Sequence, residues 1–309
     1  MTGVGSTGFA GAGAGTSTAV VLMAYGSPDK LSAVPAYYAD IRGGRPIRPE
    51  SLDDLVQRYR RLGIEDSNPL NEITEATRAA LEAELGLPVL TGMRHWRPRI
   101  AEAVERALEG GAETLVGLVL APHYSSMSIE RYRAQLVEAV ADRAEIRFVE
   151  SWGAEPGFVE LLADRLVTER REHVVFTAHS LPARIVAEGD PYEEQLLETS
   201  RLVAERAGVA AWSFSYQSES PTGEPWLGPD ILDHLSELAE KGVRDVLVCP
   251  VGFVADHLEI RWDLDVEAQE RARELGLRLA RIELPNADPA FVRVLAGLVR
   301  RAAAVPSPT

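Results

Sequence analysis

The chain has 309 residues, a formal net charge of −15 and 46% hydrophobic residues, which suits a soluble globular protein of two domains. Net acidity argues against nucleic acid as the main partner, because phosphate binding needs a basic face, although a few local arginines could still hold a small anion. No apolar run approaches the roughly 20 residues of a membrane-spanning helix, so we expect no integral membrane segment.

Residues 1–18 are mainly Gly, Ala, Ser and Thr. They lack the basic start and the solid apolar core of a signal peptide. This composition predicts a disordered tail, and the cytoplasm is the expected location of the protein.

Short apolar runs then alternate with amphipathic stretches. The strand candidates are residues 19–24, 88–92, 114–120, 145–149, 173–177, 210–215, 244–249 and 277–282. The helix candidates include residues 69–85, 97–108, 229–241 and 288–303. This alternation predicts an α/β protein of two doubly wound halves, 19–150 and 151–309, each with a four-stranded parallel sheet. We expect a cleft between the halves, and the last helix could pack on either of them.

Ligands of doubly wound sheets bind beyond the carboxyl ends of the strands. The segments that follow the predicted strands present Tyr25, His95, His123, His179, Gln217 and His257. For His95 and His123, bracing a loop is about as good an explanation as a direct role. His173 begins a strand and His234 lies mid-helix, so both are better explained as surface or satisfied core histidines.

A row of carboxylates follows one of these strands. In ADHLEIRWDLDVEAQ, residues 255–269, a helix would place Glu259, Asp263 and Glu267 at i, i+4 and i+8, on one face. In an acidic protein such a row can be a solvated surface. Together with His179, the same row could bind a divalent cation weakly or accept protons.

Several other chemistries are disfavoured. The single cysteine, Cys249, excludes an intramolecular disulfide and a metal cluster held by four cysteines. No glycine-rich phosphate loop follows a strand, so a nucleotide cofactor is unsupported. Ser180 lacks the Gly-x-Ser-x-Gly context of a hydrolase nucleophile and is better explained as a turn residue.

Five segments resemble the ferrochelatase family, and they occur in the family's order. They are MAYGSP at 23–28, LAPHYSS at 120–126, TAHSLP at 177–182, QSESPTGEPWLGP at 217–229 and VGFVADHLEIRWDLDVEAQ at 251–269. The resemblance covers roughly residues 19–303. It implies a two-lobed, Rossmann-like chelatase-type fold that inserts ferrous iron into a porphyrin. Fe(II) is then a substrate, with no permanently bound cofactor and no [2Fe-2S] cluster.

The resemblance also implies site residues. His179 and Glu259 match the catalytic pair, which with Asp263 and Glu267 also lies along the metal path. Tyr25 matches the tyrosine that coproporphyrin-type members place against the metal. Arg42 matches a propionate contact, and Arg45, Asn68 and Tyr132 are further porphyrin contacts. His95 and His123 are expected to support the site.

The substrate expected from this resemblance is coproporphyrin III, which has four propionates. Tyr25 and the nearby arginines Arg42, Arg45 and Arg58 favour it. The alternatives are a ferrochelatase for protoporphyrin IX and a chelatase for another metal or tetrapyrrole. A carrier of porphyrin or haem without turnover fits less well, because a carrier needs no acid–base residues. Other expected partners are neighbouring enzymes of the haem pathway, in transient contact.

Overall fold

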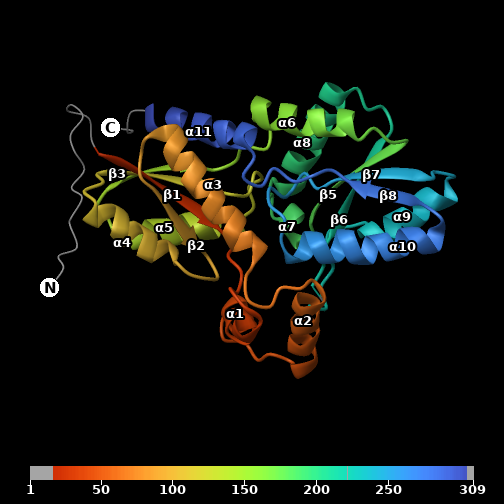
Figure 1. The fold of residues 1–309 in the computed structure, drawn as a ribbon, viewed down its shortest axis with the longest axis horizontal. Coiled ribbons are helices and arrows are strands. Elements are labelled where there is room, and N and C mark those ends of the chain that lie inside the picture. Colours follow the sequence, from red (N-terminus) through yellow and green to blue (C-terminus); the bar gives the residue numbers. More distant parts are fainter. Residues whose placement is uncertain (1–16, 221, 305–309) are drawn as a thin grey trace.

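The computed structural model describes residues 17–220 and 222–304, in which two four-stranded parallel sheets lie side by side (Figure 1). Their strand orders are β2-β1-β3-β4 and β6-β5-β7-β8. The strands are β1 (Thr18–Ala24), β2 (Val89–Met93), β3 (Thr114–Val119), β4 (Glu145–Val149), β5 (His173–His179), β6 (Trp212–Gln217), β7 (Asp245–Cys249) and β8 (Arg278–Arg281). The predicted α/β class and both sheets are confirmed.

Helices connect these strands and cover the sheets. They are α1 (Val34–Ile41), α2 (Pro49–Arg61), α3 (Pro69–Leu85), α4 (Ile100–Glu109), α5 (Ile129–Val140), α6 (Pro156–Thr168), α7 (Arg184–Ala187), α8 (Tyr192–Ala207), α9 (Ile231–Glu240), α10 (Gln269–Leu275) and α11 (Pro289–Ala304), with the short 3₁₀-helix η1 (Leu31–Ala33) and the π-helix η2 (Ile260–Ala268). Among the described helices, none has the length and apolarity needed to cross a membrane.

Local signals place the boundaries of several elements. Helix α3 spans the predicted residues 69–85 because Asn68 caps it, with its side chain accepting from the backbone N–H of Leu70, and Gly86 ends it at a φ of 65°. Helix α4 begins at Ile100 rather than at the predicted residue 97, because Arg99 occupies the N-cap position. Residues 1–16 of the predicted tail, 1–18, lie outside the described range. Thr18, predicted as the last residue of the tail, is instead the first residue of β1.

The direction in which successive strands are added reverses at the corresponding position in both sheets. Strand β1 pairs with β2 on one side and β3 on the other, and β5 likewise pairs with β6 and β7. Each sheet therefore has a topological switch point, between β1 and β3 and between β5 and β7. Ligands of doubly wound sheets bind at such points.

The two switch points face each other across the junction of the halves. The loop after β3 contacts the second half directly, since the backbone N–H of Tyr124 donates to Gln195 Oε1 at 2.8 Å. The next residues of this loop bond to Asp190, with the Ser126 N–H at 2.7 Å from its Oδ2 atom. These contacts bring the carboxyl ends of the two sheets together.

Helix α11 joins the halves from the opposite side. It packs against α3, β3 and β4 of the first half and against α6 (Figure 1). Near the start of α11, Phe291 lies in an aromatic cluster with Trp152 and Phe158. The ring centroids of Trp152 and Phe158 are 5.1 Å apart. Burial of these large rings fixes the helix across the junction.

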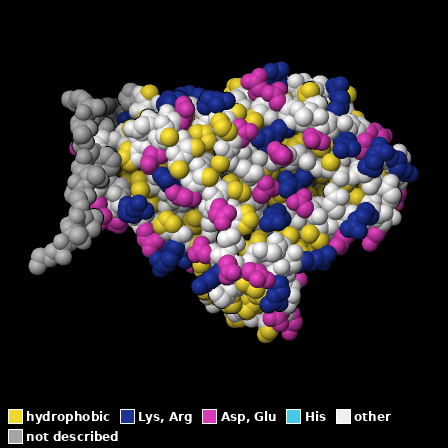
Figure 2. Space-filling view, in the orientation of Figure 1, with side chains coloured by type: hydrophobic (Ala, Val, Ile, Leu, Met, Phe, Trp, Pro, Cys, Tyr) yellow, Lys and Arg dark blue, Asp and Glu magenta, His cyan; other side chains and the backbone are white. Residues whose placement is uncertain are grey.

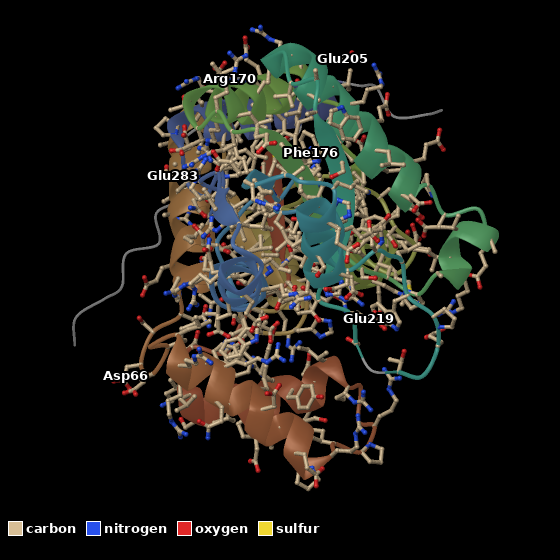
Figure 3. All side chains as sticks on the ribbon, turned by 90° about the vertical axis from the view of Figure 1, so that its right-hand side faces the viewer. Asp66, Arg170, Phe176, Glu205, Glu219 and Glu283 are labelled. Carbon is tan, nitrogen blue, oxygen red and sulfur yellow. The ribbon has the colours of Figure 1, made fainter. Side chains whose placement is uncertain are left out.

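Helices α1 and α2 form an arm that projects below the sheets, as Figures 1 and 3 both show. Its small core of Val34, Tyr59 and Ile64 also contacts Leu258, just before the π-helix. The arm therefore belongs to the first half in sequence but touches the second half in space.

Figure 2 shows charged side chains of both signs interspersed over the visible face of the molecule, including the arm.

Candidate active site

His179 and Glu259 form the centre of the candidate site. His179 is the last residue of β5, and Glu259 follows the neighbouring strand β7 and precedes η2. The His179 Nε2 atom lies 3.6 Å from Glu259 Oε1. The Nδ1 atom of His179 faces the carbonyl of Ser180, so Nε2 is the nitrogen presented to the carboxylate.

The two groups hold each other in their charged forms. Burial lowers the pKa of His179, but the Glu259 carboxylate outweighs this effect and raises the pKa to about 9. Burial raises the pKa of Glu259, but His179 and His257 outweigh it and hold the pKa well below its usual range. His257 contributes through its Nε2 atom, 3.3 Å from Glu259 Oε2. At neutral pH the pair is therefore an imidazolium and a carboxylate.

Asp263 lies one step further along the carboxylate row. Its side chain is buried and receives hydrogen bonds from Ser218 Oγ and, at 3.4 Å, from Gln217 Nε2. Burial raises its pKa to about 6, helped by the carboxylates of Glu259 and Glu267. Asp263 can therefore take up and release a proton near neutral pH.

The row continues on a π-helix rather than on an ordinary α-helix. The i→i+5 hydrogen bonds of η2 put more residues in a turn than the 3.6 of an α-helix. A spacing of four residues then falls just short of a full turn instead of just past it. Glu259, Asp263 and Glu267 consequently stay on one side of the helix, as the sequence predicted.

Tyr25 approaches the same place from the first half. Its ring centroid lies 4.7 Å from that of His95, and the His95 N–H donates to the Tyr25 carbonyl at 2.9 Å. Although 41% of the residue is accessible, surrounding protein and the Glu259 carboxylate raise the pKa of the Tyr25 phenol. The Tyr25 phenol therefore lies within electrostatic reach of Glu259, the partner of His179.

The two supporting histidines have different surroundings. His95 Nδ1 lies 2.9 Å from Asp40 Oδ2, and Arg99 Nη2 donates to the other carboxylate oxygen of Asp40 at 2.6 Å. Because Asp40 belongs to α1, this cluster ties the arm to the end of β2. Burial, the largest influence, lowers the pKa of His95, so the ring next to Tyr25 is neutral near pH 7.

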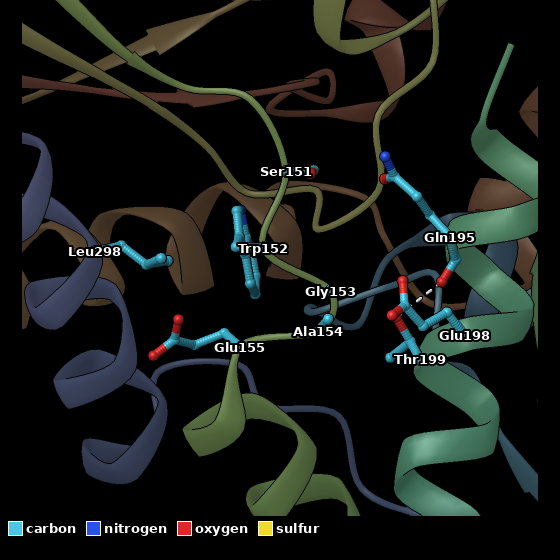
Figure 4. A pocket seen from close by; sticks show the side chains of 9 residues that line it. All are labelled: Ser151, Trp152, Gly153, Ala154, Glu155, Gln195, Glu198, Thr199 and Leu298. Carbon is cyan, nitrogen blue, oxygen red and sulfur yellow. Dashed lines mark hydrogen bonds between the residues drawn. The ribbon is translucent and has the colours of Figure 1, made fainter.

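His123 lies deeper and away from the pair. It is 3% exposed, its Nε2 is 2.9 Å from Thr199 Oγ1, and burial lowers its pKa to about 3. Thr199 and Gly153 also line a pocket of about 290 Å³ between α6, α8 and α11, drawn in Figure 4. That pocket contains neither His179 nor Glu259. His123 contacts α8 across the junction of the halves, and a supporting role in the site stays a prediction.

The residues expected to contact the propionates have different surroundings in the structure. Arg42 and Arg45 occupy the turn after α1, where Arg45 Nε donates to the Arg42 carbonyl at 3.0 Å. Asn68 is 5% exposed, and its amide donates to Ser27 Oγ at 2.7 Å and to the Pro28 carbonyl at 3.1 Å. The amide of Asn68 therefore holds the MAYGSP turn, and its contact with the porphyrin stays a prediction.

Tyr132 and Arg58 each contact a side chain from another part of the chain, and their roles toward a porphyrin stay predictions. Tyr132 is 3% exposed, and the Arg94 guanidinium covers its ring at 5.6 Å from the centroid. Arg58 pairs with Asp54 at 2.9 Å and lies over the Trp262 ring at 5.1 Å. The Arg94 guanidinium therefore lies against the Tyr132 ring, and Arg58 contacts both Asp54 and Trp262.

Sequence reasoning missed Trp226 and Ser218, and it placed His257 at a strand end without identifying its partner. Trp226 has its ring centroid 6.5 Å from that of His179, His257 touches Glu259, and Ser218 touches Asp263. Trp226 and Ser218 both lie in the segment QSESPTGEPWLGP, one of the five segments that resemble the family. Their roles depend on how this loop folds back onto β5, which the motif alone does not reveal.

Comparison with known proteins agrees with this geometry. The ferrochelatase family model matches residues 17–303. The chain belongs to the ferrochelatase family. A ferrochelatase of Herpetosiphon aurantiacus is 42% identical over 300 residues, covering 91% of this chain and 98% of that protein. A coproporphyrin III ferrochelatase of Halalkalibacterium halodurans is 40% identical over 299 residues, covering 91% and 96%.

Solved structures share the fold of this ferrochelatase at low sequence identity. SirB from Bacillus subtilis with Fe³⁺ aligns with a TM-score of 0.60 at 13% identity, over 93% of this chain and 96% of that one. CbiX, described as the terminal enzyme of sirohaem biosynthesis in denitrifying bacteria, aligns with a TM-score of 0.53 at 17% identity, over 93% and 99%. The predictions of a chelatase fold and of a porphyrin-metallating enzyme are confirmed.

Proposed function

We propose that this ferrochelatase inserts Fe(II) into coproporphyrin III, with Fe(II) as a substrate and without a resident cofactor. The observation that carries the proposal is the His179–Glu259 pair at the β5/β7 switch point, 3.6 Å apart and close to Tyr25 of the first half. Metallation removes two N–H protons from the pyrrole rings and adds one dication. The site must therefore accept protons and admit a cation.

The charged pair accounts for the first requirement. A dication and an imidazolium repel each other, so the proton on His179 leaves as the metal arrives. The freed Nε2 atom and the Glu259 carboxylate then present a nitrogen and an oxygen to the metal or to a pyrrole N–H. We assign proton transfer to the pair as a unit, because the two groups titrate together.

Asp263 and Glu267 account for the second requirement. Carboxylate oxygens bind a divalent transition metal such as Fe(II) weakly enough to exchange it, which suits an ion that must be bound briefly and released. Asp263, whose pKa is raised to about 6, can also carry protons away from Glu259 toward solvent. We therefore propose that the carboxylate row on η2 serves as the path of Fe(II) toward the pair and of protons away from it.

The choice of coproporphyrin III depends on the cationic groups in the turn after α1. Within residues 17–220 and 222–304, Arg42 and Arg45 form no ion pair with a carboxylate, and Arg42 Nε is buried without a hydrogen-bond partner. Each arginine–carboxylate contact is strongest when the guanidinium is free of competing acids. Several relatives of about the same similarity are named coproporphyrin III ferrochelatases, which supports the same choice.

A second candidate is insertion of iron into protoporphyrin IX, because the names of other relatives specify no porphyrin. Those of Herpetosiphon aurantiacus and Deinococcus radiodurans, each 42% identical, are named simply ferrochelatase. The test is anaerobic metallation with Fe(II), comparing kcat/KM for coproporphyrin III and protoporphyrin IX at equal detergent. A clear preference for coproporphyrin III is expected, and equal or reversed values would select the second candidate.

A further inference from the structure

The peptide group between His179 and Ser180 is held at both of its polar ends. On the β6 side, the Ser180 N–H donates to the Gln217 carbonyl at 2.7 Å. On the opposite side, the Tyr192 hydroxyl donates to the His179 carbonyl at 3.0 Å. Because a peptide group is planar, these two hydrogen bonds fix the orientation of the whole group.

The Tyr192 hydroxyl acts where the sheet itself supplies no strand. The paired register of β5 with β7 ends at Phe176, and beyond it the Gly252 N–H reaches the Thr177 carbonyl at 3.1 Å. Carbonyls two residues apart in a strand point to the same side, so the His179 carbonyl comes next on that side, past the end of β7. A carbonyl in such a place needs a donor, and Tyr192 provides it.

This peptide group controls the direction of the His179 imidazole. The Ser180 carbonyl, which can only accept, takes the Nδ1–H of the ring. A rotation of the 179–180 peptide would move the backbone on both sides of that contact. With Nδ1 held, Nε2 faces Glu259 Oε1 at 3.6 Å. The Tyr192 hydroxyl thus helps to set which way the reacting nitrogen points.

Tyr192 is held in turn by Asp190, which contacts the first half. The Tyr192 N–H donates to Asp190 Oδ1 at 3.0 Å. Asp190 Oδ2 accepts from the N–H and the hydroxyl of Ser126, each at 2.7 Å, in the loop between β3 and α5. Burial raises the pKa of the Tyr192 phenol, and the Glu259 and Asp190 carboxylates add to this effect, so the hydroxyl remains a donor.

We propose that Tyr192 is a positioning residue for His179, and that Asp190 makes this positioning depend on the contact between the two halves. The inference deepens the proposed function, since it takes His179 and Glu259 as the reacting pair. The loop after β3 holds Asp190, Asp190 holds the first turn of α8, and Tyr192 holds the imidazole toward Glu259. The hydroxyl acts through the backbone of His179 rather than on the substrate.

The first test is Tyr192→Phe, which removes the hydroxyl and keeps the ring. The kcat of metallation should fall about tenfold or more, because a misdirected acid–base group loses much of its effect. KM for the porphyrin and equilibrium binding of the iron-free porphyrin should stay close to those of the wild type, since no group that faces the porphyrin changes.

Tyr216→Phe is the matched control. Tyr216 is also buried, and its hydroxyl donates to Glu193 Oε1, in the same turn of α8, at 3.1 Å. The variant loses a hydrogen bond of α8 but none of the 179–180 peptide, so its kcat should be that of the wild type. An equal loss of kcat in both variants would overturn the inference, since it would show a general effect on α8.

NMR of protein labelled at histidine separates positioning from a simple loss of stability, and it needs neither iron nor porphyrin. In Tyr192→Phe the imidazole signals of His179 should shift or broaden. Those of His173, at the opposite end of β5, should stay unchanged and serve as the internal reference. A lower melting temperature with unchanged His179 signals and wild-type kcat would overturn the inference.

Asp190→Asn tests the link to the first half. The Asp190 carboxylate accepts from the backbone N–H groups of both Tyr192 and Ser126, and an amide must turn its own NH₂ toward one of them. The kcat should fall, and the double variant Asp190→Asn/Tyr192→Phe should lose no more than the larger single loss, because both changes act on one peptide. Losses that multiply would refute the link.

The proposed function can fail independently of this inference. Wild-type kcat/KM for the two porphyrins decides the substrate, and the kcat of each variant is compared with the wild type on whichever porphyrin the wild type prefers. The His179 signals are recorded without substrate. If the wild type metallated neither porphyrin, the proposed function would be wrong, and the NMR comparison would still decide whether Tyr192 orients His179.

Discussion

The imidazole of His179 and the carboxylate of Glu259 form a close ion pair, although they come from two different strand ends. Their 3.6 Å separation follows from the neighbouring positions of β5 and β7 in the second sheet. The pair shifts both pKa values in opposite directions, upward for His179 and downward for Glu259. Its chemistry is therefore a property of two residues together.

Removing either member of the pair should abolish most of the metallation. We expect His179→Ala and Glu259→Gln to lower kcat by about 100-fold or more, the usual effect of losing a positioned acid–base group. Porphyrin binding should remain, because neither change removes a propionate contact. Stopped-flow absorbance and porphyrin titration measure the two effects, and turnover like that of the wild type in either variant would refute the assignment.

The charge of His179 should depend on Glu259. In Glu259→Gln the opposing charge is lost while burial remains, so the His179 pKa should fall well below its value of about 9. NMR titration of the imidazole carbons measures it. An unchanged pKa would mean that another group holds the proton.

The same pair predicts a pH dependence of stability. The raised pKa of His179 contributes stability fully below its ordinary value near 6.5, and this contribution is lost as the pH rises through about 9. The lowered pKa of Glu259 contributes above its ordinary value near 4.5. The difference in melting temperature between wild type and Glu259→Gln should therefore shrink between pH 6.5 and 9.5. A constant difference across this range would contradict the coupling.

The carboxylate row should act on the metal rather than on the porphyrin. We expect Asp263→Asn and Glu267→Gln to raise KM for Fe(II) several-fold more than KM for porphyrin, since they remove oxygen ligands from the path. Glu240→Gln, at an exposed position of α9, is a control for the loss of one negative charge. Equal effects on both substrates would mean that the row is only a solvated surface.

Trp262 should matter for the attachment of the arm. Trp262 is 9% exposed, and the guanidinium groups of Arg58 and Arg61 lie 5.1 and 5.3 Å from its ring centroid. Arg61 also pairs with Glu270 at 2.6 Å. Replacing Trp262 with alanine should lower the free energy of unfolding by about 3 kcal/mol, because a large buried ring is removed.

Trp226→Ala, beside His179, should instead change porphyrin binding with little effect on the free energy of unfolding. Denaturant unfolding compares the two.

The sequence by itself determined the features that depend on local patterns. Period and composition predicted every strand of both sheets, and Asn68, Pro69 and Gly86 marked the ends of α3, because caps and apolar runs act over a few residues. The motifs also singled out His179 and Glu259 as candidates. These signals need no knowledge of what lies across the molecule.

Only the tertiary structure decided which groups meet and in what charge state. The amide of Asn68 turned out to be used by Ser27 and Pro28, and the ring of Tyr132 to be covered by Arg94, which the sequence had not marked. The pKa values of His179 and Glu259 depend on burial and on a 3.6 Å contact between segments far apart in the chain. Desolvation and Coulomb interactions act through space, so no local pattern of residues encodes them.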